Sequence, residues 1–228
     1  MSVPPNLVAV IVAAGSSQRM GFDKLTAPLL GRPLIVHTLA AFQHCPDVAS
    51  AVLVCAAGRV GEFQALAAEF PKVTHVVPGG KERFDSVRLG LETFTSPLPD
   101  FVAVHDGARP LILPETISRC YQEAKTFGAA VCAEPETDTL HRVDAGRCTV
   151  ENVPRQNLWR MQTPQITGFS RLLSLIRDLP EAGVTDEVSV LMRAGGRARV
   201  VETPEGNFKV TYPRDIPLAE HVLKTRTS

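Results

Sequence analysis

The chain has 228 residues, of which 44% are hydrophobic and 21% are charged, as in ordinary soluble globular proteins large enough for a substantial core. Lysine plus arginine and aspartate plus glutamate both number 24, so no overall charge indicates nucleic acid or an anionic membrane as a partner. No apolar run reaches the ~18–20 residues of a membrane span, and no secretory signal opens the sequence, so we expect a cytoplasmic protein.

A segment near the N-terminus carries the clearest chemical pattern. The apolar run Leu7–Val12 predicts a strand buried on both faces, and it ends abruptly in the small residues Ala13–Ser17. Such a loop lets a ligand approach bare backbone N–H groups, and the cations Arg19 and Lys24 follow it. The pattern predicts a polyphosphate site, with a plain strand and turn carrying two surface cations as the alternative. It matches neither the dinucleotide glycine fingerprint nor the P-loop.

Strands and helices then alternate along the chain. We expect helices at 33–42, 60–70, 83–94 and 114–127, and strands at 49–55, 73–77, 101–105 and 129–133. Alternation at this spacing predicts parallel β-α-β units joined by right-handed crossovers, and hence an open α/β sandwich. In such sheets ligands bind at the carboxyl ends of the strands, so the loops 13–24, 78–86 and 105–110 should line one crevice.

The second of these loops carries two adjacent glycines. Gly79 and Gly80 permit close approach of the backbone, and Arg83 and Ser86 stand at the start of a helix, where N–H groups favour bound anions or polar base edges. A simple turn with a serine in the first helical turn would show the same residues.

The third loop places an acid just beyond a buried strand. Asp106 would lie opposite the phosphate loop, where a carboxylate can hold Mg²⁺ together with phosphates. An ion pair between Asp106 and Arg109 that only fixes the turn is the alternative. We expect the neighbouring His105 to be a packed imidazole rather than a catalytic group.

The pattern changes after Ala133. Short alternating segments surround the turn signal Asp144-Ala145-Gly146 and predict a β-hairpin with too few apolar positions for a core of its own. Because such a hairpin usually packs on a partner subunit, we expect a homodimer by exchange of an arm at about 136–158, built on a single domain of residues 1–228. Beyond the arm we expect a helix at 169–179, a helix N-capped by Thr185, strands at 197–202 and 206–211, and a helix at 213–224.

Several motifs occur in an order specific to one family. They are AAGSSQRM with Lys24, GGKERFDSV, VHDGARP, TDTL, RQNLWRMQTPQ, TDEVSV and NFKVTYPRD. From about Val8 to Ala219 the sequence resembles the 2-C-methyl-D-erythritol 4-phosphate cytidylyltransferases of the non-mevalonate isoprenoid pathway. The resemblance implies an open, mostly parallel, Rossmann-like nucleotidyltransferase sheet with helices on both faces and a projecting β-hairpin arm.

The resemblance also implies roles for individual residues. Arg19 and Lys24 would stabilise the charge that develops as the α-phosphorus of CTP is attacked, and Asp106 would face Mg²⁺ and the substrate. The nucleotide would contact Ala13, Ala14, Gly15, Gly79, Gly80, Arg83 and Ser86. The polyol phosphate would be positioned by Arg109, Thr139, Arg155, Thr185 and Lys209, with Thr139 and Arg155 donated by the arm of the partner subunit.

The implied reaction transfers CMP from CTP to a polyol phosphate and releases pyrophosphate. The attacking phosphate oxygen is already an anion, so positioning and charge stabilisation suffice and no general base is needed. His141, Glu136 and Thr167 depart from the family pattern, and the first two lie near the expected arm contacts. A cytidylyltransferase for another polyol phosphate, such as ribitol 5-phosphate, is therefore the alternative. A regulatory protein that only binds a nucleotide is disfavoured, because it would not need the residues expected to hold the triphosphate and also those expected to hold the polyol phosphate.

Overall fold

A seven-stranded sheet forms the centre of the computed structural model, which describes residues 6–15, 20–178, 185–203 and 206–227. The strands lie in the order β11-β7-β10-β6-β1-β4-β5. Their bounds are β1 (Leu7–Ala13), β4 (Val48–Cys55), β5 (Val73–Pro78), β6 (Phe101–Asp106), β7 (Ala129–Pro135), β10 (Trp159–Gly168) and β11 (Arg199–Glu202). Every pairing in this sheet is parallel except those that β10 makes with β6 and β7, which confirms the expected mostly parallel sheet.

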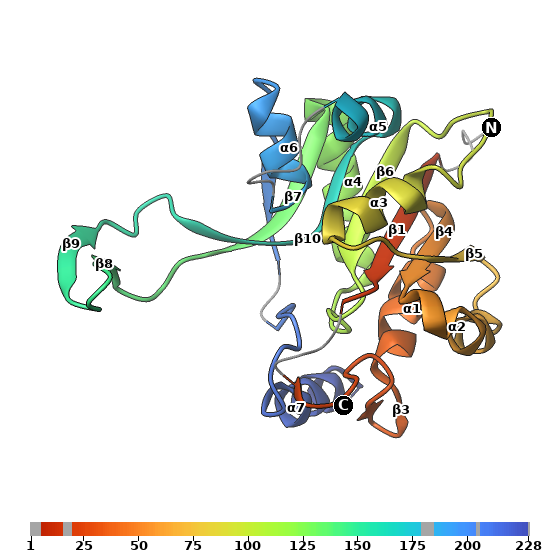
Figure 1. Cartoon of the computed structure of the whole chain (residues 1–228), viewed down its shortest axis with the longest axis horizontal. Coiled ribbons are helices and arrows are strands. Elements are labelled where there is room, and N and C mark those ends of the chain that lie inside the picture. The colour runs from red at the N-terminus through yellow and green to blue at the C-terminus, as the bar shows by residue number, and fades with distance from the viewer. Residues whose placement is uncertain (1–5, 16–19, 179–184, 204–205, 228) are drawn as a thin grey trace.

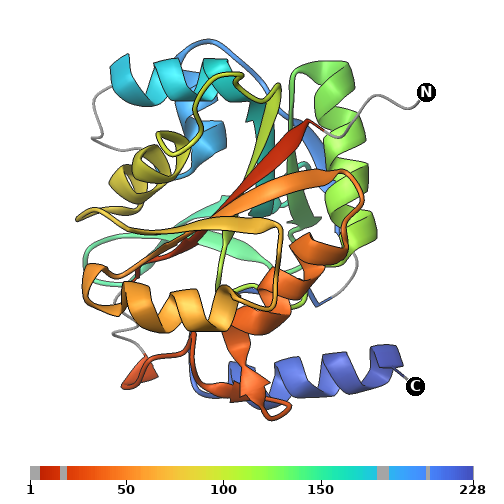
Figure 2. The same cartoon turned by 90° about the vertical axis from the view of Figure 1, so that its right-hand side faces the viewer.

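Helices cover both faces of this sheet, as predicted (Figure 2). Alternation along β1 directs Leu7 and Ile11 into one core and Val8 and Val10 into another, which explains why this strand is apolar throughout. The first core is packed by α1 (Leu34–His44), α2 (Val60–Ala67) and α4 (Pro114–Phe127). The second is packed by α3 (Arg83–Leu91), α5 (Phe169–Asp178) and α6 (Glu187–Arg193).

The predicted strands and helices of the first half are confirmed, with ends displaced by a few residues. The helix α4 has the predicted bounds because both of its ends are marked in the sequence. Pro114 occupies the first turn, where its missing N–H costs nothing, and Gly128 ends the helix at φ 85°, in the left-handed region. The helix α2 ends at Ala67, three residues before the predicted end.

The strand β10 was not predicted, although it lies between β6 and β7 and has buried side chains from Gln162 to Thr167. Proline lacks a backbone donor and normally argues against an interior strand. Here Pro164 falls in a break of the pairing with β7, between Met161 and Gln165, so no ladder hydrogen bond is needed from it.

Two predictions for the C-terminal third are wrong. The segment 206–211 forms no strand, because its polar backbone groups bind elsewhere: the N–H of Val210 donates to the carbonyl of Ala108 at 2.9 Å. Thr185 does not cap α6. Asp186 is the N-cap, and its Oδ1 accepts the N–H of Ser189 at 2.8 Å. The last helix, α7 (Asp215–Thr227), lies beside the small β2–β3 hairpin (Pro28–Leu29 and Arg32–Pro33).

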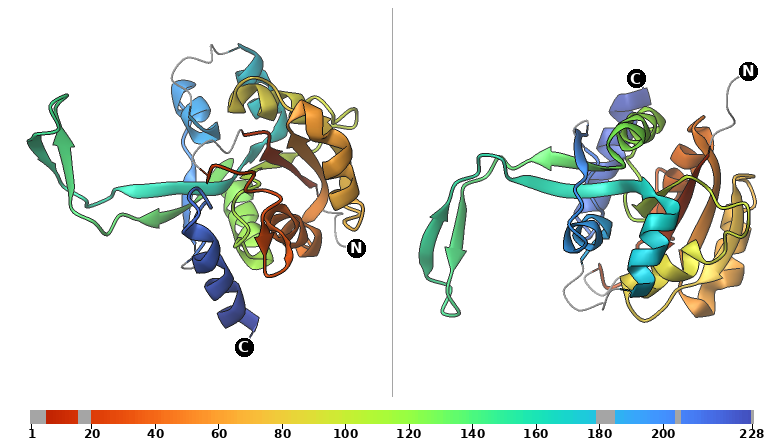
Figure 3. Two further views of the ribbon diagram at one scale, coloured as in Figure 1. Left: turned by 60° about the horizontal axis from the view of Figure 1, so that its bottom comes forward. Right: turned by 90° about the horizontal axis from the view of Figure 1, so that it is seen from above.

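The predicted hairpin is present and stands away from the rest of the chain (Figures 1 and 3). Its strands are β8 (Leu140–Val143) and β9 (Thr149–Val153), which pair antiparallel. At its base the N–H of Glu136 donates to the carbonyl of Leu158 at 2.9 Å, so the two ends of the expected arm lie side by side. Among the described residues, no helix has both the length and the apolar character to cross a membrane.

Candidate active site

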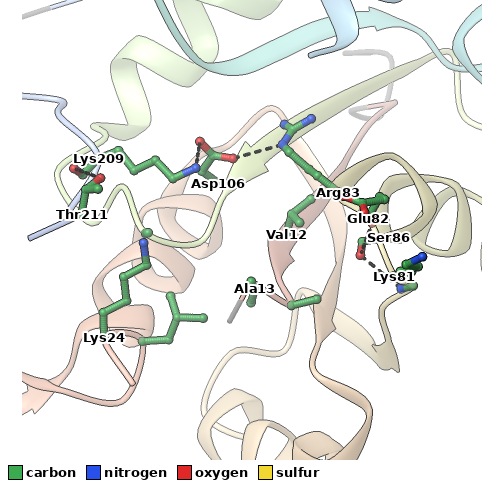
Figure 4. A pocket seen from close by; sticks show the side chains of 15 residues that line it. Val12, Ala13, Lys24, Lys81, Glu82, Arg83, Ser86, Asp106, Lys209 and Thr211 are labelled. Carbon is green, nitrogen blue, oxygen red and sulfur yellow. Dashed lines mark hydrogen bonds and ion pairs between the residues drawn. The ribbon is translucent and has the colours of Figure 1, made fainter. Parts of the chain in front are cut away.

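A cavity of about 560 Å³ opens at the carboxyl ends of β1 and β6 (Figure 4). The loops after β1, β5 and β6 contribute to it, as the position of ligands in open α/β sheets predicts. The segment around Lys209 closes it from a fourth direction. Its lining includes nine of the predicted residues: Ala13, Ala14, Gly15, Lys24, Gly80, Arg83, Ser86, Asp106 and Lys209.

The loop between β5 and α3 packs closely against the first loop. A Cβ atom at Gly79 would lie 2.5 Å from Cβ of Ala14 and 2.7 Å from Oγ of Ser86, so only glycine fits there. The buried Ser86 hydroxyl accepts the N–H of Gly80 at 3.2 Å and donates to the carbonyl of Glu82 at 3.1 Å. Ser86 therefore fixes the shape of this loop as well as lining the cavity.

The position of Lys24 is set by its neighbours. The Asp23 carboxylate accepts the N–H of Leu25 at 3.2 Å and the hydroxyl of Thr26 at 2.7 Å, and it forms an ion pair with Arg59. This turn directs Lys24 into the cavity, where its Nζ donates to the carbonyl of Val210 at 3.0 Å. The predicted residue Arg19 lies outside the described residues.

Asp106 stands at the centre of a cluster of cations. Its carboxylate lies 3.1 Å from Nζ of Lys209 and 3.4 Å from Nε of both Arg83 and Arg109. Figure 4 shows this carboxylate between the side chains of Lys209 and Arg83. The turn-fixing pair with Arg109, foreseen as the alternative to metal binding, is present, while Lys209 and Arg83 approach from the cavity.

These charges set the ionisation of the site. Burial alone would raise the pKa of Asp106, but attraction to Lys209, Arg83 and Arg109 outweighs it and holds that pKa well below its usual value. Burial would likewise lower the pKa of Arg83, but the carboxylates of Glu187 and Asp106 raise it. Both groups are charged at neutral pH, so Asp106 is an ionised carboxylate surrounded by cations.

A chain of hydrogen bonds fixes Asp106 from behind. Its N–H donates to the hydroxyl of Thr163 at 3.1 Å, and that hydroxyl then donates its one proton to Nδ1 of His105 at 3.1 Å. The ring can complete the chain by donating from Nε2 to the carbonyl of Arg109 at 3.3 Å. Burial lowers the pKa of His105 to about 3, so the ring is neutral and carries one donor and one acceptor. His105 is thus a packed, structural imidazole.

The segment with Lys209 is fastened to the same loop. Arg109 is buried, and its Nη1 donates to the carbonyl of Asn207 at 3.0 Å. The amide of Asn207 donates to the side chain of Gln162 at 2.8 Å and to the carbonyl of Thr163 at 3.1 Å. Arg109 thus connects Asp106 to this segment and does not line the cavity, unlike Lys24, Arg83 and Lys209.

Three predicted residues lie away from the cavity within one chain. Thr139 and Arg155 are exposed on the arm, where Arg155 bonds to the carbonyl of Thr137. Thr185 is exposed before α6 and contacts the hydroxyl of Ser189 at 3.1 Å.

The sequence interpretation missed several residues at the site. Lys81, Glu82 and Thr211 line the cavity, and all three fall within motifs whose neighbours were chosen. Glu187 holds Arg83 from α6, 104 positions further along the chain, and no local signal pairs these two residues. Thr163 supports Asp106 from β10, the strand that was not predicted.

Among the described residues, no group of three or more His, Cys, Asp or Glu side chains could hold a metal ion by itself. A single ionised carboxylate nevertheless suits Mg²⁺, which is commonly bound by one or two carboxylates together with substrate phosphates. Small-residue loops, cations and the Asp106 carboxylate at the carboxyl edge of a mostly parallel sheet form a site for a nucleoside triphosphate. The fold and the site together define a nucleotidyltransferase.

Comparison with known proteins makes the assignment specific. The sequence model described as 2-C-methyl-D-erythritol 4-phosphate cytidylyltransferase matches residues 7–225. A protein of that name from Azoarcus is 40% identical over 98% of this chain and 96% of its own. A solved structure of the same enzyme from Francisella tularensis is 28% identical, with a TM-score of 0.82 over 95% of this chain and 99% of its own. The chain belongs to the 2-C-methyl-D-erythritol 4-phosphate cytidylyltransferase family.

Some relatives are longer. The bifunctional enzyme IspD/IspF of Desulfotalea psychrophila is 39% identical over 97% of this chain, which spans only 58% of that relative. The shared part is therefore the cytidylyltransferase portion, and the fold and the reaction class expected from the sequence are both confirmed by family membership.

Proposed function

We propose that this chain transfers CMP from CTP to 2-C-methyl-D-erythritol 4-phosphate. An oxygen of the polyol's phosphate attacks the α-phosphorus, the bond from that phosphorus to the bridging oxygen of the β-phosphate breaks, and pyrophosphate leaves. The observation that carries the proposal is the convergence of Lys24, Lys209 and Arg83 around a cavity whose one central carboxylate is Asp106.

This arrangement suits a reaction between two polyanions. The nucleophile is already ionised, so the side chains have only to bring the phosphates together and stabilise added charge. Lys24 enters from the first loop, next to the backbone of Ala14 and Gly15, where the triphosphate is expected. Lys209 lies above Lys24 in Figure 4, with its Nζ beside Asp106, where it can hold the attacking phosphate.

We propose Asp106 as the residue that would hold Mg²⁺. The carboxylate stays ionised at neutral pH, and its low pKa is maintained by cations that a bound triphosphate would also attract. When bound, Mg²⁺ would neutralise phosphate charge and orient the triphosphate. Lys209 and Arg83 would then pair with phosphates or nucleotide in place of part of their contact with Asp106.

We propose a homodimer in which the arm of one subunit completes the cavity of the other. Thr139 and Arg155 are exposed on an arm that projects from its own body (Figure 3), and neither lines the cavity of that body. Thr185 would contribute from the start of α6.

Because CTP is a cytoplasmic nucleotide, we place the reaction in the cytoplasm.

The decisive experiment measures pyrophosphate release with CTP and Mg²⁺, comparing 2-C-methyl-D-erythritol 4-phosphate with ribitol 5-phosphate. Rapid release with the first and little with the second is the expected result. Release with ribitol 5-phosphate alone would support the same transfer of CMP but reject 2-C-methyl-D-erythritol 4-phosphate as the substrate. Release with neither would reject the catalytic assignment.

A further inference from the structure

Arg83, at the entrance of the nucleotide cavity, is held by a residue of a different helix. The Glu187 carboxylate accepts hydrogen bonds from Nη1 of Arg83 at 2.7 Å and from Nη2 at 3.1 Å, which makes a bidentate ion pair. The Glu187 side chain is 4% exposed, whereas that of Arg83 is 29% exposed and lines the cavity. Such pairs fix the plane of a guanidinium group as well as its position.

Glu187 is itself held at the first turn of α6. The N-cap Asp186 accepts the N–H of Ser189 through Oδ1, and its Oδ2 accepts the side-chain amide of Gln165 at 2.9 Å. The carbonyl oxygen of that amide accepts the N–H of Val188 at 2.9 Å. Gln165 is 3% exposed, so a buried residue of β10 sets both the position and the direction of this helix end.

We name Gln165, Asp186 and Glu187 the α6 clamp. Its effect on Arg83 follows from counting donors. A guanidinium group has five N–H donors, and Glu187 takes two of Arg83 while Asp106 takes one, at the long distance of 3.4 Å. Among the described residues these are its acceptors, which leaves two donors for a ligand. Without Glu187, Arg83 could turn both of its Nη groups onto Asp106.

We propose that Glu187 is a positioning residue for nucleotide binding, and that it acts by keeping Arg83 turned toward the cavity, so that its two Nη groups do not turn onto Asp106 as well. The α6 clamp supplies the rigidity that this task requires, because Gln165 ties α6 to the central sheet. This inference rests on the proposed use of CTP as substrate, and it assigns a role to three side chains, the buried Gln165 and Glu187 and the half-buried Asp186, that do not themselves line the cavity.

The first test measures the dissociation constant of CTP by calorimetry. Glu187→Gln keeps the shape but removes the charge and one of the two acceptors, so we expect the constant to rise about tenfold or more, as in Arg83→Ala. The KM for the polyol phosphate should stay within about threefold, since Arg83 faces the nucleotide. Glu92→Gln is the matched control, because Glu92, the C-cap residue of α3, pairs with the partly exposed Arg88 of that helix at 3.2 Å.

The second test exchanges donor and acceptor between residues 165 and 186 of the α6 clamp. Gln165→Glu sets a second carboxylate against Asp186 and should weaken CTP binding. Adding Asp186→Asn lets the new amide donate to the new carboxylate, while Val188 and Ser189 keep their acceptors. Of the hydrogen bonds of Gln165, only the long one to the carbonyl of Gln162, at 3.3 Å, is lost in both variants. We expect the double variant to bind CTP within about threefold of wild type.

The outcomes separate the two ideas. If wild type binds CTP but folded Glu187→Gln binds it equally well, or if the double variant is no better than Gln165→Glu, the role of the α6 clamp is rejected and the proposed function stands. If wild type itself does not bind CTP, both are rejected. Should Glu187→Gln fail to fold, the comparison of Gln165→Glu with the double variant Gln165→Glu/Asp186→Asn tests the role of the α6 clamp instead.

Discussion

The Nζ atom of Lys209 lies 3.1 Å from Oδ2 of Asp106, and this contact joins the end of β6 to a segment without regular structure. The two residues are 103 positions apart in the sequence. Their pairing places the cation proposed for the polyol phosphate directly beside the carboxylate proposed for the metal. Ligands that bind one of these residues will therefore change the charge seen by the other.

This contact predicts non-additive effects of substitution. Lys209→Met and Asp106→Asn should each lower kcat/KM by roughly a hundredfold or more, because each removes charge needed in the transition state. The double variant should lose less than the product of the two, since residues in direct contact are coupled by about 0.5–3 kcal/mol. Steady-state kinetics on wild type, the two single variants and the double variant measures the coupling. Strictly additive losses would mean that Lys209 and Asp106 act independently, contrary to this prediction.

Lys24 offers a separate prediction. Lys24→Ala should reduce turnover by about a hundredfold or more, with roughly 3–4 kcal/mol of transition-state stabilisation lost. The fold should survive, because Asp23, Thr26 and Arg59 hold the turn without it. Pyrophosphate release gives the rate and thermal unfolding checks the fold. Lys125→Ala on α4 is the control, and a near-normal rate in Lys24→Ala would exclude this lysine from catalysis.

The arm can be tested by mixing inactive proteins. Lys24→Ala and Arg155→Ala should each be nearly inactive alone. If the arm serves the partner subunit, a mixed dimer has one site with both residues intact, so equal mixing after subunit exchange should restore about a quarter of wild-type activity. If the arm serves its own body, no site regains both residues and no activity returns. Lys24→Ala refolded with itself is the control.

The sequence was sufficient for those parts of the fold whose signals are local. The burial of Leu7–Val12 follows from its unbroken apolar run, and the bounds of α4 follow from Pro114 and Gly128. The crevice could be predicted as well, because parallel strands bring their carboxyl ends to one edge of a sheet. Most of the residues chosen from those three loops line the cavity.

The remainder depends on contacts between distant segments. Nothing near Glu187 shows that it will hold Arg83, and Pro164 is atypical of an interior strand such as the one that carries Thr163 and Gln165. Thr185 is a good N-cap by type, but its neighbour Asp186 takes that place because Gln165 fixes its carboxylate. The segment around Lys209 looks like a strand by alternation and is held irregular by its bonds to the Asp106 loop.

The buried ring of His105 predicts how stability depends on pH. Burial lowers its pKa from 6.5 to about 3, so between these values the unfolded chain binds a proton that the folded chain does not. Stability should therefore fall as pH falls below about 6.5, by up to about 1.4 kcal/mol per pH unit and about 2 kcal/mol between pH 7 and pH 5. Denaturant unfolding at the two pH values measures this loss.

A substitution isolates the contribution of this ring. His105→Gln keeps one acceptor and one donor for Thr163 and Arg109 but cannot titrate, so its loss of stability between pH 7 and pH 5 should be smaller than that of wild type by about 2 kcal/mol. His141→Gln, on the exposed arm, should retain the wild-type dependence. Equal losses in wild type and His105→Gln would mean that His105 does not remain neutral in the folded protein, and the hydrogen-bond chain behind Asp106 would need a different assignment of protons.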